Sequence, residues 1–238
     1  MLYLIGLGLQ DEKDLSLRAL EVAKSCECYC ELYTSIWKGS LSKLENLIGK
    51  KVKQLKRRDL EENLQILLKK AKRENIAIFV PGDPLVATTH INLILEAKKE
   101  KVKTRVIHNA SIYSAIGETG LQIYKFGKSA TVPLTGKLSN VKNTIKNNKK
   151  FGLHTLLLLD LDKETGIYLK VSEALKMLLK EKILTKKDKL IVLSNAGFES
   201  EVFYDSIENL IKKEFSLPAV LVVPGRLHFR EKEFLEVL

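Results

Sequence analysis

Cysteine is scarce in this chain, and the features of secreted and membrane proteins are missing. The 238 residues contain three cysteines, Cys26, Cys28 and Cys30, and an odd number without disulfide-type spacing fits a reducing compartment. No stretch approaches the roughly 20 apolar residues that span a bilayer, and the chain begins with a strand pattern rather than a basic segment ahead of an apolar one. We therefore expect a soluble, cytoplasmic protein without a membrane partner.

The cysteines also lack the spacing of a metal site. Cysteine ligands of zinc are usually two to four residues apart and need a fourth ligand, whereas single residues separate these three. Alternate residues of a strand share one face, so the thiols should point together into the core as small apolar groups. We predict no metal site.

Two common phosphate-binding signatures are absent. The apolar residues 1–5 lead into Gly6-Leu7-Gly8-Leu9, but Asp11 stands where a dinucleotide fingerprint has its third glycine. No Gly-Lys-Ser/Thr follows either, so both the Rossmann and the P-loop interpretations are disfavoured. The pattern predicts a buried strand that ends in a turn, where glycine lets another group approach the backbone closely.

Acidic residues are missing from residues 125–150. The chain as a whole has 40 basic and 29 acidic residues, a formal net charge of +11, which suggests a polyanionic or acidic partner without choosing one. The stretch is either a solvated lysine-rich face or a surface for such a partner. Its seven lysines are Lys125, Lys128, Lys137, Lys142, Lys146, Lys149 and Lys150.

The most informative segment present is Pro81-Gly82-Asp83-Pro84, which directly follows the apolar run 76–80. A short apolar run that stops at Pro-Gly predicts a buried strand ending in a tight turn. Ligands bind at the carboxyl ends of strands in open parallel sheets, so this segment is either a plain turn or a ligand loop with Asp83 exposed in it. Ser111, after a strand near residues 102–107, is placed to cap a helix and supplies a third candidate loop.

Strand and helix patterns alternate along the chain, which predicts the α/β class and, in the first half, a parallel sheet with short crossovers. A helix is expected to begin at Asp59, with Glu62 completing a capping box and apolar residues on one face. Further strands near 153–159, 190–193 and 219–223, with helices from 172 and over 206–215, indicate a second α/β domain. We predict domains 1–109 and 110–238, with residues 137–150 forming a helix or an ordered loop.

The glycine turn, residues 81–90 and Ser111-Ile112-Tyr113-Ser114-Ala115, in this order and spacing, resemble the tetrapyrrole-methylase superfamily of S-adenosylmethionine-dependent methyltransferases. Residues 119–131, 152–157 and 223–228 resemble in particular the subgroup that acts in diphthamide biosynthesis. The likeness covers nearly the whole chain. It implies a homodimer of two-domain α/β subunits, with the donor S-adenosyl-L-methionine in the trough between the domains and S-adenosyl-L-homocysteine as product.

The resemblance also implies the site. Carried over position by position, the donor contacts in the first domain are Leu9, Asp83, Val86, Ser111 and Ile112. Those in the second domain are Leu159, Ala196 and Ala219. The implied acceptor is the amino group of a 3-amino-3-carboxypropyl-modified histidine of elongation factor two, which is methylated repeatedly and without an obligatory nucleic acid.

Two alternatives stay open from the sequence. The acceptor could be a tetrapyrrole or corrinoid precursor or ribosomal RNA, as in relatives, or the chain could be a basic binding protein without enzymatic activity. A sulfonium is already a strong electrophile, so alignment of the reactants can supply most of the acceleration. The sequence names no general base, because each of the four histidines, and Asp160 at a strand end, is also an ordinary structural residue. The histidines are His90, His108, His154 and His228.

Overall fold

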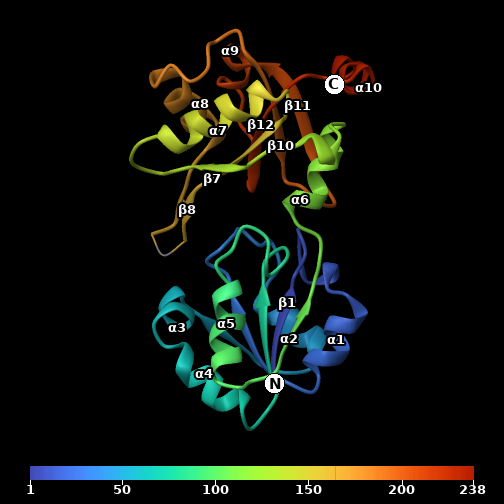
Figure 1. The fold of residues 1–238 in the computed structure, drawn as a ribbon. Helices are drawn as coiled ribbons and strands as arrows, with labels where there is room; N and C mark the ends of the chain where they lie inside the picture. Colours follow the sequence, from blue (N-terminus) through green and yellow to red (C-terminus); the bar gives the residue numbers. More distant parts are fainter. Residues whose placement is uncertain (164) are drawn as a thin grey trace. The chain divides into compact units, whose positions relative to one another are not determined.

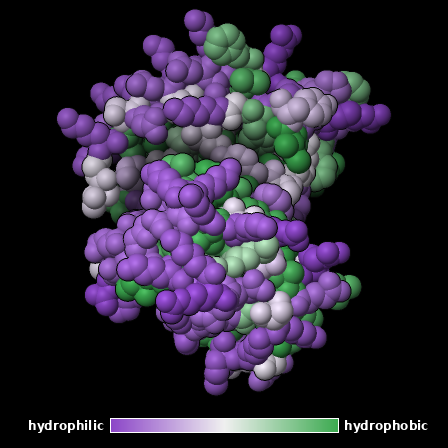
Figure 2. All heavy atoms as spheres, turned by 60° about the horizontal axis from the view of Figure 1, so that its bottom comes forward, coloured by the Kyte–Doolittle hydropathy of each residue, from purple (hydrophilic) through white to green (hydrophobic). Residues whose placement is uncertain are grey.

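The computed structural model describes residues 1–163 and 165–238. The chain divides between Ile112 and Tyr113 into two compact units, unit 1 (Met1–Ile112) and unit 2 (Tyr113–Leu238), each built on a five-stranded sheet (Figure 1). Hydrophilic residues cover most of the face drawn in Figure 2, with apolar residues in small groups among them. Among the described residues, no helix is long and apolar enough to cross a membrane.

Unit 1 is a parallel sheet with the strand order β3-β2-β4-β1-β5. Because every pair is parallel, the carboxyl ends of all five strands lie at one edge. The predicted α/β class and parallel sheet are confirmed. The strands are β1 (Leu2–Gly6), β2 (Glu27–Glu31), β3 (Val52–Leu55), β4 (Ile76–Val80) and β5 (Thr104–Ile107), and the helices are η1 (Glu12–Asp14), α1 (Leu17–Ala23), α2 (Leu41–Ile48), α3 (Arg57–Glu61), α4 (Leu64–Ala71) and α5 (Ile91–Lys99).

Helices cover both faces of this sheet (Figure 1). Successive strand residues point to opposite faces, so Leu4 and Ile78 pack with α3, α4 and α5, while Ile5 and Phe79 pack with α1 and α2. The three cysteines are buried together in the second of these cores, as free thiols. This confirms their predicted role as small apolar core residues.

The predicted single helix from Asp59 is wrong in its start and in its continuity. Helix α3 begins at Arg57, and the Asp59 carboxylate accepts a hydrogen bond from the Lys56 N–H at 2.8 Å, closing the first turn from inside the helix. The chain then leaves helical geometry at Asn63, with φ −108° and ψ 16°, and resumes at Leu64 as α4. Asp59 is thus the third residue of the helix rather than its first, and it caps the helix by accepting a hydrogen bond from the backbone of Lys56, three residues before it.

Unit 2 has the strand order β11-β10-β12-β7-β6, in which β12 is antiparallel to both of its neighbours and β6 is parallel to β7. Its sheet is therefore mixed. The strands are β6 (Ala130–Val132), β7 (Thr155–Leu159), β8 (Leu161–Asp162), β9 (Ile167–Tyr168), β10 (Lys189–Ser194), β11 (Glu201–Ser206) and β12 (Ala219–Val223), and the helices are α6 (Ile112–Ala115, starting at the last residue of unit 1), η2 (Ile116–Thr119), η3 (Ile123–Lys125), α7 (Ser139–Lys150), α8 (Val171–Lys180), α9 (Ile207–Leu210) and α10 (Phe229–Glu236).

Two helix predictions in unit 2 have different outcomes. The polar run 137–150 is helical from Ser139, with Val141 and Ile145 buried and the lysines exposed. The predicted helix over 206–215 exists but is shorter than predicted, because Ser206 still belongs to β11 and α9 spans Ile207–Leu210. After that point Lys212 and Lys213 donate backbone hydrogen bonds to the third residue before them, which tightens and ends the helix.

Candidate functional site

The loops after β1 and β4 are fastened to each other at the carboxyl edge of unit 1. The Gly8 N–H donates to the Gly82 carbonyl at 3.2 Å, and the Gly82 N–H donates back to the Gly8 carbonyl at 2.8 Å. A Cβ on Gly6 would lie 2.5 Å from the Gly82 carbonyl oxygen and 2.7 Å from the Asn109 Cβ. Glycine is therefore required at position 6 for this close approach.

Asp83 joins the loop after β4 to the loop after β5. Its side chain is only 7% exposed, and its Oδ1 accepts a hydrogen bond from the Leu85 N–H at 2.9 Å. Its Oδ2 accepts from the Asn109 N–H at 3.2 Å and lies 2.8 Å from Nδ1 of His108. The expectation that Asp83 lies exposed in a turn is wrong, because β4 and β5 flank β1 and the loop after β5 reaches Asp83 across the end of β1.

Asn109 and Asp14 hold the loop after β1, and sequence reasoning missed both. The Asn109 amide donates to the Gly6 carbonyl at 3.0 Å and to the Asp14 carbonyl at 2.9 Å. The Asp14 carboxylate accepts from the backbone N–H groups of Leu9, at 2.9 Å, and Gln10, at 2.8 Å. A short polar side chain just after a predicted strand was the available signal.

The remaining predicted donor residues of unit 1 lie on these same loops. Val86 is half-buried, and its N–H donates to the Asp83 carbonyl at 3.2 Å. Ser111 is buried and, with Ile112, leads from the loop after β5 into α6. The fastened loops thus place Leu9, Asp83, Val86, Ser111 and Ile112 at one edge of the sheet.

The predicted residues of unit 2 share an edge of their own sheet. Ala219 opens β12 opposite Ser194, the last residue of β10, and the same strand pairs its Val220 with Leu158 of β7. Leu159, at the end of β7, is therefore next to Ala219 across the strands. Ala196 follows β10 in a turn where the Asn195 N–H donates to the Pro218 carbonyl at 2.7 Å.

Asp160 has a structural role. One of its carboxylate oxygens accepts from the Leu134 N–H at 3.1 Å and the other from the Leu161 N–H at 2.9 Å. The carboxylate thereby holds two backbone segments at the end of β7. These bonds account for an acidic residue at this strand end without a role in proton transfer.

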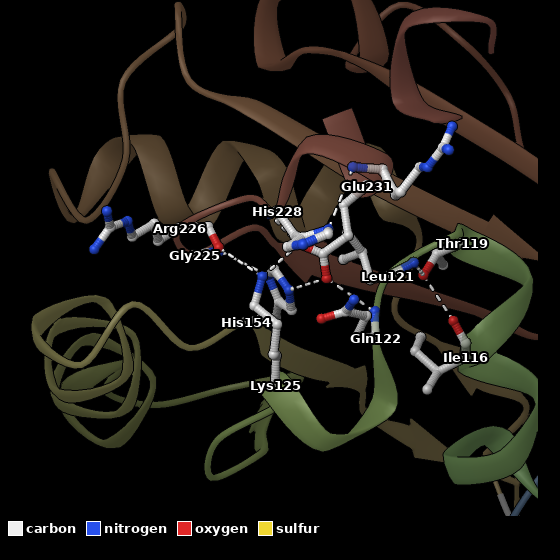
Figure 3. Close-up of polar contacts among 11 residues, drawn as sticks. Ile116, Thr119, Leu121, Gln122, Lys125, His154, Gly225, Arg226, His228 and Glu231 are labelled. Atoms are coloured by element: carbon white, nitrogen blue, oxygen red, sulfur yellow. Dashed lines mark hydrogen bonds and ion pairs between the residues drawn. The ribbon is translucent and has the colours of Figure 1, made fainter. Parts of the chain in front are cut away.

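Two of the histidines are buried. Burial lowers the pKa of His90 to about 4, and its Nδ1 lies 3.3 Å from the Pro84 carbonyl oxygen. Burial also lowers the pKa of His154, whose Nδ1 accepts from the Gly225 N–H at 2.9 Å while Nε2 lies 3.1 Å from Glu231 (Figure 3). Both rings are enclosed by protein groups.

The other two histidines are exposed. His228 precedes α10, and its Nδ1 accepts a hydrogen bond from the Arg230 N–H at 3.4 Å. The His108 side chain is 67% exposed, while its Nδ1 is within hydrogen-bond distance of the buried carboxylate of Asp83. With Nδ1 donating to a carboxylate, the neutral ring presents Nε2 as a proton acceptor. Of the four histidines, His108 has the geometry of an oriented base at the predicted site.

Glu231 organises a second polar cluster, in unit 2. Its carboxylate forms an ion pair with Lys125 and accepts from the backbone N–H groups of Gln122, at 2.9 Å, and His228, at 2.6 Å (Figure 3). Burial would raise the pKa of Glu231, but Lys125 and these hydrogen bonds outweigh it and lower the pKa to about 2. The residues of this cluster are not among the predicted donor contacts.

The described residues contain no group of three or more His, Cys, Asp or Glu side chains that could hold a metal ion.

The sequence profile of the tetrapyrrole (corrin/porphyrin) methylases matches residues 1–211. The chain belongs to this family. The superfamily membership inferred from the sequence is confirmed.

Full-length relatives make the placement within the methylase family narrower. The diphthine synthase of Methanocaldococcus jannaschii is 40% identical over 100% of this chain and 98% of its own length. That of Methanosarcina barkeri is 45% identical over 99% of this chain and 94% of its own. A crystal structure of a diphthine synthase superposes with a TM-score of 0.93 at 42% identity, covering 100% of this chain and 95% of that one. The methylase fold and the predicted enzyme class, an S-adenosylmethionine-dependent methyltransferase, are confirmed.

Proposed function

We propose that S-adenosyl-L-methionine contacts Leu9, Asp83, Val86, Ser111, Ile112, Leu159, Ala196 and Ala219. The observation that carries this proposal is the set of fastened loops at the carboxyl ends of β1, β4 and β5, since this edge of an open parallel sheet is where ligands bind. Val86 and Ile112 are half-buried apolar residues that suit the adenine ring. The backbone groups around them suit the polar end of the donor.

The acceptor in this proposal is elongation factor two. The relatives are named diphthine synthase, and the reaction is the repeated methylation of the amino group on its 3-amino-3-carboxypropyl-modified histidine, in diphthamide biosynthesis. The protein acts in the cytoplasm as a homodimer and needs no nucleic acid for this reaction. S-adenosyl-L-homocysteine is released after each transfer.

When bound, the donor supplies a methyl group on a positively charged sulfur. The chain must hold the acceptor amine in line with that methyl group and receive the proton that the amine loses, because only the neutral amine has a lone pair to attack with. We assign the proton to Nε2 of His108. The buried carboxylate of Asp83 orients the ring and stabilises the imidazolium that forms.

A two-part assay tests the proposal. Calorimetry should show S-adenosylmethionine and its product binding in the micromolar range, about −8 kcal/mol. Labelled donor should then transfer its methyl group to elongation factor two that carries the aminocarboxypropyl group. The unmodified factor lacks this amine and serves as control. Donor binding without transfer to the modified factor would reject the acceptor, and the absence of donor binding would reject the site.

The variant His108→Asn tests the base. The asparagine amide can still donate to Asp83 from nearly the position of Nδ1, but it has no second nitrogen to receive a proton. We expect kcat to fall by about tenfold or more while donor affinity stays within about twofold. An unchanged kcat would contradict the assignment, and a lost donor affinity would show that His108 serves binding instead.

A further inference from the structure

Unit 2 carries a groove of about 550 Å³ that no residue of the proposed donor site lines. Three of its lining residues are basic, one is aromatic and none is acidic. The volume lies in the range of pockets that hold small ligands. The lining residues are Lys149, Lys150, Phe151, Gly152, Pro224, Gly225 and Arg226.

The groove and the proposed donor residues of unit 2 lie at opposite ends of the same strands. Gly152 precedes β7 and Arg226 follows β12, whereas Leu159 ends β7 and Ala219 begins β12. The strand β7 alone covers about 13 Å between Thr155 and Leu159, at about 3.3 Å per residue, and Gly152 lies three positions before it. The groove is therefore separate from the proposed donor contacts of unit 2, none of which lines it.

The positive charge in the groove is not neutralised by neighbouring side chains. Among the ion pairs of the described residues, none involves Lys149, Lys150 or Arg226. The two lysines stand in the last turn of α7, where the helix dipole favours cations. That effect does not account for Arg226, which comes from the loop after β12. Cations from two separate segments converge on one concave surface.

The backbone beneath the groove is held in place. The Arg226 N–H donates to the Gly152 carbonyl at 3.0 Å, and the Arg226 carbonyl accepts from the Lys125 ammonium at 2.8 Å. The Gly225 N–H donates to Nδ1 of His154, and the Nε2 of that ring contacts the Glu231 carboxylate (Figure 3). The buried cluster around Glu231 thus fixes the loop that presents Arg226. A site whose backbone is already ordered loses less entropy when it binds.

An aromatic ring stands beside these cations. Phe151 is 73% exposed, and the Lys150 ammonium lies 5.8 Å from the centre of its ring. Lys142 and Lys146 are exposed on α7 at four-residue spacing, so they continue the row of cations away from the groove at steps of about 6 Å. A row of cations with an exposed ring is the combination that binds single-stranded nucleic acids, because phosphates pair with the cations and bases stack on the ring.

We propose that this groove binds single-stranded RNA. The phosphates of the RNA pair with the cations of Lys149, Lys150 and Arg226, and one base stacks on the ring of Phe151. An acidic peptide could use the same cations, but it would leave the ring of Phe151 without a partner. The inference does not rest on the proposed methylation, since the groove is remote from the donor residues and its test measures binding alone.

The first test uses the full-length protein and a fluorescein-labelled oligouridylate of about twelve nucleotides, a length within the range covered by single-strand binding sites. Anisotropy should show saturable binding. Phe151→Leu should weaken it by about tenfold, because leucine has no face on which a base can stack. The matched control is Phe198→Leu, at a residue that is 91% exposed in unit 2 outside the groove, which should bind as the parent does. Equal affinities for the parent and Phe151→Leu would overturn the proposal.

The second test separates the groove from general positive charge. The triple variant Lys149→Ala/Lys150→Ala/Arg226→Ala should make the plot of log affinity against log salt shallower by about 2, since each phosphate contact to a single strand contributes about 0.7. The control removes three exposed lysines elsewhere in unit 2, Lys186, Lys187 and Lys212, and should leave the slope unchanged. Equal changes in the salt slope for the two triple variants would overturn the proposal. So would a polyglutamate peptide that binds the parent as tightly as the oligouridylate does and binds Phe151→Leu equally well.

Discussion

Asp83 shows how one side chain can fasten two loops. Its buried carboxylate accepts hydrogen bonds from the Leu85 and Asn109 N–H groups and holds the exposed ring of His108. A buried carboxylate that accepts several hydrogen bonds stabilises the loops that donate them, and removing it leaves those donors without partners. The residue implied to contact the donor therefore also shapes the place where the donor would bind.

Asp83→Ala should consequently reduce both stability and donor affinity. We expect the free energy of unfolding to fall by about 2 to 4 kcal/mol, because two partly buried backbone donors lose their acceptor. Donor affinity should fall by about tenfold or more, because the loops after β4 and β5 are no longer fastened. Urea unfolding and calorimetry measure the two effects. Glu62→Ala, at an exposed position, is the control and should change stability by less than about 0.5 kcal/mol. Stability equal to the parent's would show that the hydrogen bonds of Asp83 contribute nothing.

At the scale of elements, the candidate edge of unit 1 depends on how closely β1 approaches its neighbours. Gly6 ends β1, Gly82 follows β4 and Asn109 follows β5, and a methyl group added at Gly6 would have no space between the other two. The tight contact fixes the spacing between the three loops. A single atom added at the end of β1 should therefore affect all of them.

Gly6→Ala tests this dependence. The new Cβ would lie 2.5 Å from the Gly82 carbonyl oxygen, so the loop after β4 must shift, at a cost of about 1 to 3 kcal/mol in stability. Donor affinity should fall with it. Gly117→Ala is the matched control, since its Cβ would meet nothing closer than 3.5 Å and should change stability by less than about 0.5 kcal/mol. Wild-type donor affinity in Gly6→Ala would mean that this contact does not shape the site.

For the molecule as a whole, two buried histidines make stability depend on pH. Burial holds the pKa of His90 near 4 and lowers that of His154, whereas the unfolded chain has histidine pKa values of about 6.5. Below about pH 6.5 the unfolded state therefore binds protons that the folded state does not. Their contribution to stability is fully present above that pH and is lost as the pH falls toward 4.

We predict that the free energy of unfolding falls as the pH is lowered from 7 to 4.5, by about 2 to 3 kcal/mol from His90 alone. Urea unfolding at a series of pH values measures this slope. His90→Asn keeps a donor for the Pro84 carbonyl but does not titrate, so its slope should be shallower. The control His228→Asn, at an exposed histidine, should keep the slope of the parent. The same slope in His90→Asn and the parent would contradict the prediction.

The sequence by itself determined the buried strands of unit 1 that lead into the candidate loops. Apolar runs such as Ile76–Val80 encode buried strands locally, and the alternate spacing of Cys26, Cys28 and Cys30 by itself predicts that the thiols share one core. The family could also be predicted, because its motifs are continuous segments such as Pro81-Gly82-Asp83-Pro84. Periodicity and adjacency along the chain carry this kind of information.

Only the tertiary structure decided which distant residues meet. The burial of Asp83 depends on a partner loop 25 or more residues away, and the mixed sheet of unit 2 depends on the direction of β12. The groove arises because antiparallel β12 returns Arg226 to the beginning of β7, beside the end of α7. These contacts follow from strand order and strand direction. No local sequence pattern encodes these contacts, because the two groups in each contact are far apart along the chain and meet only through the fold.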